Sequence, residues 1–213
     1  MKQVAIVGLG LATHDDAPFV DPEWECWGLP WDREYWVHYD QYFEMHPRSL
    51  LELPESKRET GYFDKLAEID HAPIYMHQHW DDIPNSVAFP IEEMRSTVFA
   101  NFPRKYWKQK PQVDWYNSSP GYMLAKAIHE EYDRIGLWGF DMESKRDYTY
   151  ELPNLSFLIG LAIGRGIDVY LHEGDRPVTP LLEFTNEGIW LGELNPVYTE
   201  RYGYLNGNDN YTR

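Results

Sequence analysis

The sequence predicts an α/β domain of the Rossmann-like type, with a mostly parallel sheet, helices on both faces and a C-terminal β-hairpin. Two observations support this fold class. The chain opens with a short apolar run at residues 4–7 that ends at Gly8, which is typical of a strand buried on both faces. Residues 112–171 then alternate strand-like and helix-like segments. Short helical crossovers of this kind join parallel strands through right-handed connections.

The chain length sets the domain organisation. A chain of 213 residues is long enough for one domain with a core and short for two. We therefore expect a single domain over residues 1–213. Residues 81–111, rich in proline, charge and aromatic side chains, predict a lid over the ligand or an insertion. Residues 180–213 predict a C-terminal extension, with a hairpin around Thr185-Asn186-Glu187-Gly188.

In the first half, apolar runs predict strands at residues 24–29, 39–45 and 73–76, and a helix near residues 57–69. In the second half, a strand at residues 113–116 leads into Asn117-Ser118-Ser119-Pro120. These residues offer two hydroxyls for an N-cap and a proline suited to the first helical turn. Strands at residues 135–139 and 167–171 enclose a second helix at residues 154–163, which ends at Gly164-Arg165-Gly166.

Composition narrows the function classes. The formal net charge of -16 argues against broad contact with nucleic acid, which needs Lys and Arg to displace counterions. The single cysteine, Cys26, excludes an internal disulfide and fits a reducing cytoplasm. The apolar run at residues 4–11 is too short to cross a membrane. We therefore expect a cytoplasmic protein with no membrane contact. Its 9 Trp and 16 Tyr favour clefts and interfaces, and so indicate a large groove or a homo-oligomer.

Ligands of parallel sheets bind beyond the carboxyl ends of the strands, so the loops there hold the candidate site residues. Gly8 and Gly10 resemble the start of a dinucleotide fingerprint, although Thr13 occupies the place of the third glycine. The turn either faces a phosphate or ribose, or is purely structural. Asn117-Ser118-Ser119 begin a predicted helix, and helix N-termini favour anions. These residues therefore either bind an anionic group or serve only as a helix cap. The remaining candidates follow the other strands: Gly28, Asn117, Ser118, Ser119, Trp138 and Asp141.

Titratable side chains supply the candidate catalytic groups. Glu44 and His46 follow a predicted strand, where they either line the ligand site or form a surface turn. His77 and His79 with Asp81 and Asp82 form a conceivable metal site, but no third histidine is suitably spaced. We therefore expect no metal and no resident cofactor. The sequence contains no nucleophile elbow, Walker A loop or kinase signature, which weighs against simple hydrolase and kinase functions.

Five segments resemble the bacterial sialyltransferases of glycosyltransferase family 42, and related Rossmann-like proteins that phages carry. They lie at residues 4–10, 118–128, 135–141, 167–171 and 181–182, and begin with Val4-Ala5-Ile6-Val7-Gly8-Leu9-Gly10 and Ser118-Ser119-Pro120-Gly121-Tyr122. In that family these loops hold a cytidine-monophosphate sugar. The resemblance thus implicates Gly8, Gly10, Ser118, Ser119 and Tyr148. The family's catalytic histidine precedes its last helix, where this chain has Tyr150 and Glu151.

These observations favour a nucleotide-sugar-dependent transferase, acting in the host cytoplasm if a phage encodes it. In this hypothesis Ser118 and Ser119 hold the donor phosphate, Tyr148 stabilises the leaving group, and Glu151 or His46 deprotonates the acceptor. Two alternatives stay open. One is a non-catalytic protein that captures a nucleotide or a nucleotide-derived signal. The other is an enzyme that modifies nucleotides or DNA bases, with the basic segment at residues 104–110 as its track.

Overall fold

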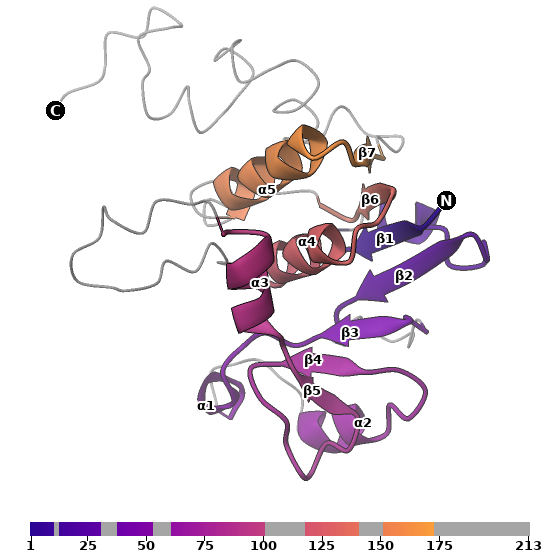
Figure 1. Cartoon of the computed structure of the whole chain (residues 1–213). Helices are drawn as coiled ribbons and strands as arrows, with labels where there is room; N and C mark the ends of the chain where they lie inside the picture. Colours follow the sequence, from indigo (N-terminus) through magenta and orange to yellow (C-terminus); the bar gives the residue numbers. More distant parts are fainter. Residues whose placement is uncertain (11–12, 31–37, 53–60, 101–117, 141–150, 173–213) are drawn as a thin grey trace, which may run out of the picture.

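The computed structural model describes residues 1–10, 13–30, 38–52, 61–100, 118–140 and 151–172 (Figure 1). Within them a seven-stranded sheet has the order β5-β4-β3-β2-β1-β6-β7, and all neighbouring strands are parallel. The strands are β1 (Gln3–Val7), β2 (Trp24–Gly28), β3 (Gln41–Phe43), β4 (Ile74–Met76), β5 (Ser86–Ala88), β6 (Arg134–Trp138) and β7 (Asp168–Leu171). The predicted Rossmann-like α/β fold is confirmed.

The strand order reverses between β1 and β6. From β1 the chain adds β2, β3, β4 and β5 on one side, and then returns to place β6 and β7 on the other. A parallel sheet has its topological switch point at such a reversal, and ligands bind outside the carboxyl ends of the strands there. All five residues of β1 are buried, as expected of a central strand covered on both faces.

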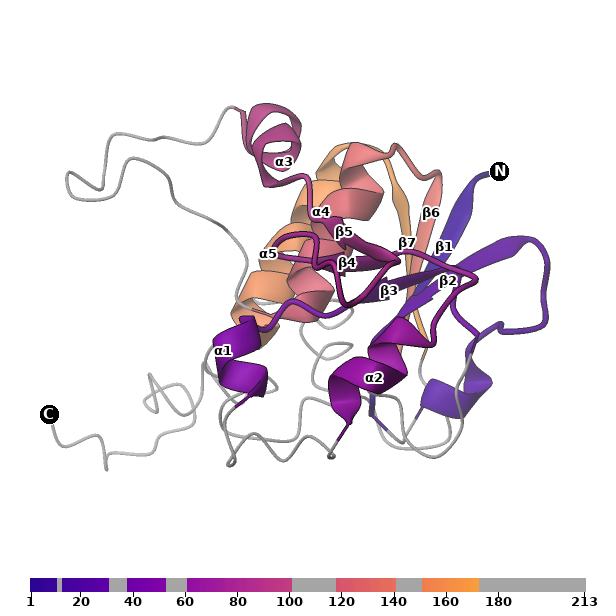
Figure 2. The ribbon, with the colours of Figure 1, turned by 90° about the horizontal axis from the view of Figure 1, so that it is seen from below.

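Helices cover both faces of the sheet (Figure 2). Val4 and Ile6 of β1 pack on the side of α3 (Ile91–Thr97), α4 (Ser119–His129) and α5 (Leu152–Gly164). Ala5 and Val7 face the other side, where α1 (Arg48–Leu51) and α2 (Tyr62–Ala67) contribute to the core. Successive side chains of a strand point to opposite faces, so one short apolar strand serves both layers.

The first part of the predicted lid belongs to the folded domain. Residues 81–100 contain β5 and α3, and Phe89, Met94 and Val98 are buried in the core. The remainder of that segment, residues 101–111, lies outside the described residues. The predicted strand at residues 113–116, the C-terminal extension and the hairpin lie outside them as well.

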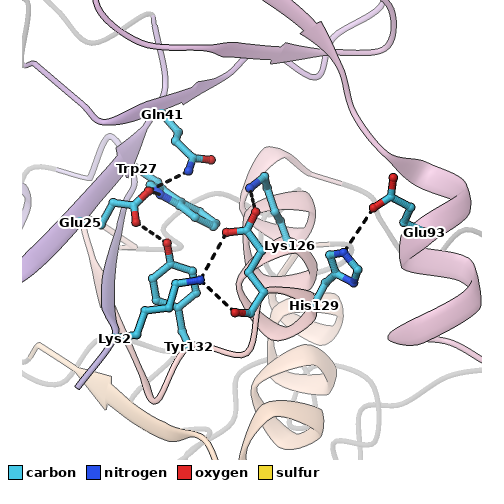
Figure 3. Close-up of polar contacts among 9 residues, drawn as sticks. Lys2, Glu25, Trp27, Gln41, Glu93, Lys126, His129 and Tyr132 are labelled. Carbon is cyan, nitrogen blue, oxygen red and sulfur yellow. Dashed lines mark hydrogen bonds and ion pairs between the residues drawn. The ribbon is translucent and has the colours of Figure 1, made fainter.

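A polar network joins the edge of the sheet at which the strands begin (Figure 3). The Glu25 carboxylate accepts hydrogen bonds from Trp27 Nε1 and Gln41 Nε2, both at 2.7 Å, and from the Tyr132 hydroxyl. Lys126 is 2% exposed, pairs with Glu130, and lies 4.8 Å from the centre of the Trp27 ring. The network links β2, β3, the end of α4 and the approach to β6. We call it the closed end of the sheet.

Candidate functional site

The carboxyl ends of the strands form the other edge of the sheet, which we call the open end. Residues 130–133 join α4 to the start of β6, and residues 165–167 join α5 to the start of β7. Both helices therefore begin at the open end, as Figure 1 shows. Each strand delivers its following residues to the same place. The open end is thus the candidate functional site.

The loops after β1 and β6 pack directly against each other. The Gly8 amide donates to Trp138 O at 2.8 Å, and the Gly10 amide donates to Gly139 O at 2.8 Å. A Cβ on Gly8 would lie 2.4 Å from the Gly139 carbonyl oxygen. The Thr13 hydroxyl, in the place of the third fingerprint glycine, accepts the Gly139 amide at 2.7 Å. The close packing of the two loops therefore explains why residue 8 is a glycine. The same packing uses the Gly10 amide in a hydrogen bond to Gly139 O.

Gly28 and Trp138 both lie in the interior beneath this edge. A Cβ on Gly28 would lie 2.1 Å from Tyr39 Cζ, so the tyrosine ring occupies the space that a side chain would need. Trp138 is 4% exposed and meets Trp24 edge to face with ring centres 5.3 Å apart. These contacts account for the burial of both side-chain positions, while the buried Trp138 Nε1 has no hydrogen-bond partner in the described ranges.

The start of α4 has an uncommon N-cap. Ser118 has the extended backbone of an N-cap residue, yet its side chain makes no capping hydrogen bond. Its carbonyl oxygen instead accepts the Gly121 amide at 3.0 Å. Across the described part of the chain the buried Ser118 hydroxyl oxygen has no hydrogen-bond partner. A buried hydroxyl without a partner is costly, so such groups usually mark a water, an ion or a ligand.

The start of α5 lies beside the start of α4. A Cβ on Gly121 would lie 2.6 Å from Asn154 Oδ1, which places the two first turns in contact. Ser156, one turn into α5, is 8% exposed, and its hydroxyl has no hydrogen-bond partner in the described ranges. Glu151 is the N-cap residue of α5 and is half-buried. Two helix N-termini, each with partial positive charge, thus meet at the open end.

Glu44 and His46 follow β3 and contact each other. The Glu44 side chain is 3% exposed, whereas the His46 side chain is 42% exposed. Glu44 Oε1 lies 2.6 Å from His46 Nδ1 and accepts the His46 amide at 3.2 Å. The hydroxyl of Tyr62, from α2, donates to Glu44 Oε2. The Glu-x-His spacing was visible in the sequence, but Tyr62 was not a candidate there, because its contact depends on how α2 packs.

The start of α4 reaches the ends of β3 and β4. Phe43 pairs with Tyr75 in the sheet, so His46 and His77, which follow these strands, lie at the same edge. Tyr122, in the first turn of α4, meets the His77 ring with centres 6.1 Å apart. The imidazole of His46 and the hydroxyl of Ser118 therefore belong to one edge of the molecule.

Arg48 fixes the segment that follows His46. Its guanidinium donates to both carboxylate oxygens of Asp82, each at 2.7 Å, and to Glu52 Oε1 at 2.9 Å. It also lies over the rings of Phe63 and Trp80, 4.4 and 4.7 Å from their centres. These contacts raise the pKa of the guanidinium, chiefly through the Asp82 hydrogen bonds. Arg48 thus anchors α1, and its guanidinium is already paired with the carboxylates of Asp82 and Glu52.

Three of the site residues predicted from the sequence cannot be placed, and the structure bears on two further kinds of site. Asn117, Asp141 and Tyr148 lie outside the described residues. In the ranges that the structure describes, no three His, Cys, Asp or Glu side chains are grouped to hold a metal ion. None of the helices there is long and apolar enough to span a membrane. His79, a candidate ligand in the sequence, instead has Nδ1 2.8 Å from Ser86 O.

The fold and its open end define a Rossmann-like protein with a candidate site for an anionic ligand. No protein-family model matches the chain, and no curated protein matches it. Similar solved structures include the sialyltransferase CstII from Campylobacter jejuni with cytidine-5'-monophosphate, at 17% identity, TM-score 0.49, covering 86% of this chain and 83% of that one. Its complex with CMP-3FNeuAc shares 16% identity at TM-score 0.50, covering 84% and 81%. The second match shows that the chain has a fold similar to that of this sialyltransferase.

Proposed function

We propose that this protein binds a nucleotide or nucleotide sugar at the open end of its sheet and acts as a nucleotide-sugar-dependent transferase. The observation that carries the proposal is the buried Ser118 hydroxyl, which has no hydrogen-bond partner in the described part of the chain at the start of α4. A phosphate oxygen would accept its proton. Ser119 would add a second donor to the same phosphate.

The surroundings of Ser118 support an anionic group in spite of the net charge of -16. The partial positive ends of α4 and α5 meet there, because Gly121 and Asn154 lie in contact. The CstII structure with a TM-score of 0.50 contains CMP-3FNeuAc, which is a ligand of this chemical class. A donor phosphate held by helix dipoles and hydroxyls needs no excess of lysine or arginine.

The proposed reaction transfers a sugar to an acceptor hydroxyl. A base takes the proton of the hydroxyl, the oxygen bonds to the anomeric carbon, and the bond from that carbon to the phosphate oxygen breaks. Tyr148 would stabilise the departing nucleotide phosphate. Of the two candidate bases, His46 is favoured over Glu151, because a buried carboxylate contacts one of its ring nitrogens while 42% of its side chain is exposed.

A thermal-shift screen against cytidine, uridine and guanosine nucleotides and their sugars tests binding. We expect at least one of these ligands to stabilise the protein. Ser118→Ala should bind that ligand about 10-fold more weakly or worse, because it loses a hydrogen bond to a charged group. Ser96→Ala is the matched control, since its hydroxyl bonds to Glu93 O within α3.

Two results of the screen would contradict the proposal. One is the absence of any shift, and the other is equal binding by wild type and Ser118→Ala. Ligands that bind should then be incubated with candidate acceptors, and release of free nucleotide should be measured. Stabilisation without turnover would support the capture of a nucleotide, and would overturn the transferase part alone.

A further inference from the structure

We infer that Glu44 is a positioning residue that orients His46 as a base, and that Tyr62 fixes Glu44 in turn. The inference rests on the proposed function for the identity of the substrate, but the arrangement of the three side chains can be tested without any substrate. The three residues come from two elements, the end of β3 and the first turn of α2. A pair of this kind would give the open end a defined proton acceptor.

The hydrogen bonds determine which nitrogen of His46 carries the proton. Glu44 Oε1 receives the His46 amide at 3.2 Å, and Oε2 receives the Tyr62 hydroxyl. An ionised carboxylate can only accept hydrogen bonds. We therefore assign the hydrogen of the Glu44–His46 contact to Nδ1 of His46, 2.6 Å from Oε1. In the neutral ring the lone pair then belongs to Nε2, the nitrogen that would accept a proton from an acceptor hydroxyl.

The burial of the pair fits catalysis better than a turn alone. A turn at the end of β3 needs only the bond from the His46 amide to Glu44 Oε1. The imidazole bond is additional, and it joins a side chain that is 3% exposed to one that is 42% exposed. A buried acid beside an exposed imidazole is the arrangement by which a third group orients a base. Tyr62, at 8% exposure, holds that acid from α2.

Nitrogen-15 NMR of the histidine rings tests the pair directly. We expect neutral His46 in wild type to be the Nδ1–H tautomer, with its resonances assigned by their loss in His46→Asn. Glu44→Ala should convert it to the Nε2–H tautomer, whereas Glu44→Gln, which keeps an acceptor oxygen, should retain Nδ1–H. Glu68→Ala, at an exposed position after α2, is the control and should change nothing. Circular dichroism verifies that each variant is folded.

A turnover arm separates this inference from the proposed function. If a sugar donor is found, Glu44→Ala should lower kcat roughly 100-fold with little change in the donor KM, and Glu44→Gln should restore part of that loss. An Nε2–H tautomer in wild type, or no change in Glu44→Ala, would overturn the inference even if turnover occurs. The expected tautomers without any binding of nucleotides would leave the pair standing and overturn the proposed function.

Discussion

Two glutamates at opposite ends of the sheet show how the same residue type can either stabilise the fold or take part in proton transfer. Glu25 lies in β2 at the closed end, and Glu44 follows β3 at the open end. Each carboxylate accepts from a tyrosine hydroxyl, Tyr132 in the first case and Tyr62 in the second. The two sites differ in their other donors, and that difference decides what each site can do.

At the closed end, the donors to Glu25 belong to the interior. Trp27 is 0% exposed and Tyr132 is 2% exposed, so neither can turn to water if the carboxylate is lost. Figure 3 shows these side chains converging on Glu25. At the open end, His46 is partly exposed and can exchange protons with solvent. A carboxylate surrounded by buried donors stabilises the fold, while one joined to an exposed imidazole can take part in proton transfer.

Removing each carboxylate is the strongest test of this comparison. Glu25→Ala should lower the free energy of unfolding by about 3 kcal/mol, because it leaves the Trp27 and Tyr132 donors buried without an acceptor. Glu44→Ala should lower it by less, about 2 kcal/mol, because it leaves one buried donor, the Tyr62 hydroxyl, without this acceptor, while water can replace the bond to His46. Urea denaturation followed by circular dichroism measures both. Equal losses, or a larger loss for Glu44→Ala, would break the comparison.

Alkaline pH should destabilise the protein through buried groups that keep their protons in the native state, of which Cys26 and Tyr132 in and beside β2 are two. Burial raises the pKa of the Cys26 thiol from 9.0 to about 12, with Asp40 adding to the effect, and burial with the Glu25 hydrogen bond raises the pKa of Tyr132. Below the unfolded pKa both states keep the thiol proton, and stability is complete. Above it only the unfolded chain releases the proton, so the free energy of unfolding falls by at most about 1.4 kcal/mol per pH unit.

The alkaline effect is measured by urea denaturation from about pH 8 to pH 11. Cys26→Ala should make the decline shallower between the unfolded and folded pKa values of the thiol, because it removes one linked proton. Tyr132→Phe should make it shallower at a higher pH, above the ordinary tyrosine pKa of 10.0. A stability that does not change over this range would show that neither group keeps its proton in the native state.

The sequence predicted the central elements, because their patterns are local. The apolar run of β1 and the capped, periodic segment of α4 correspond closely to the predicted strand and helix. β5 escaped prediction because it is an edge strand of three residues, with Val87 and Ala88 exposed and no apolar alternation. A short edge strand is defined by its pairing with β4, which no local pattern indicates.

The candidate site was predicted less completely than the fold, for the same reason. Glu44 and His46 are close in sequence, so their proximity could be expected. The contact of Tyr62 with Glu44, and that of Tyr39 with Gly28, join segments brought together only by packing. A glycine after a strand predicts ligand approach or close packing equally well. Only the surrounding side chains distinguish the two.

Two serine-to-alanine substitutions compare the stability cost of losing the Ser118 hydroxyl at the open end with that of losing the hydrogen-bonded Ser86 hydroxyl. An N-cap Ser→Ala change normally costs about 1 kcal/mol. Ser118→Ala should cost less than about 0.5 kcal/mol, because its hydroxyl makes no cap bond. Ser86→Ala should cost about 1 to 2 kcal/mol, since its buried hydroxyl accepts the Trp80 amide at 2.8 Å. A loss for Ser118→Ala as large as that for Ser86→Ala would mean that its hydroxyl is already engaged in the unliganded protein.

The smallest effect is expected at Glu131, in the turn that leads from α4 to the closed end. Its φ of 56° lies in the left-handed region, which disfavours residues other than glycine. Glu131→Gly should raise the free energy of unfolding by up to about 1 kcal/mol, the relief of strain being partly offset by the freedom that glycine adds to the unfolded chain. Glu68→Gly, at a φ of -77°, is the matched control and should lower it by about 0.5 to 1 kcal/mol. If both variants lose stability equally, the turn before Tyr132 is unstrained, and the closed end depends on its polar network alone.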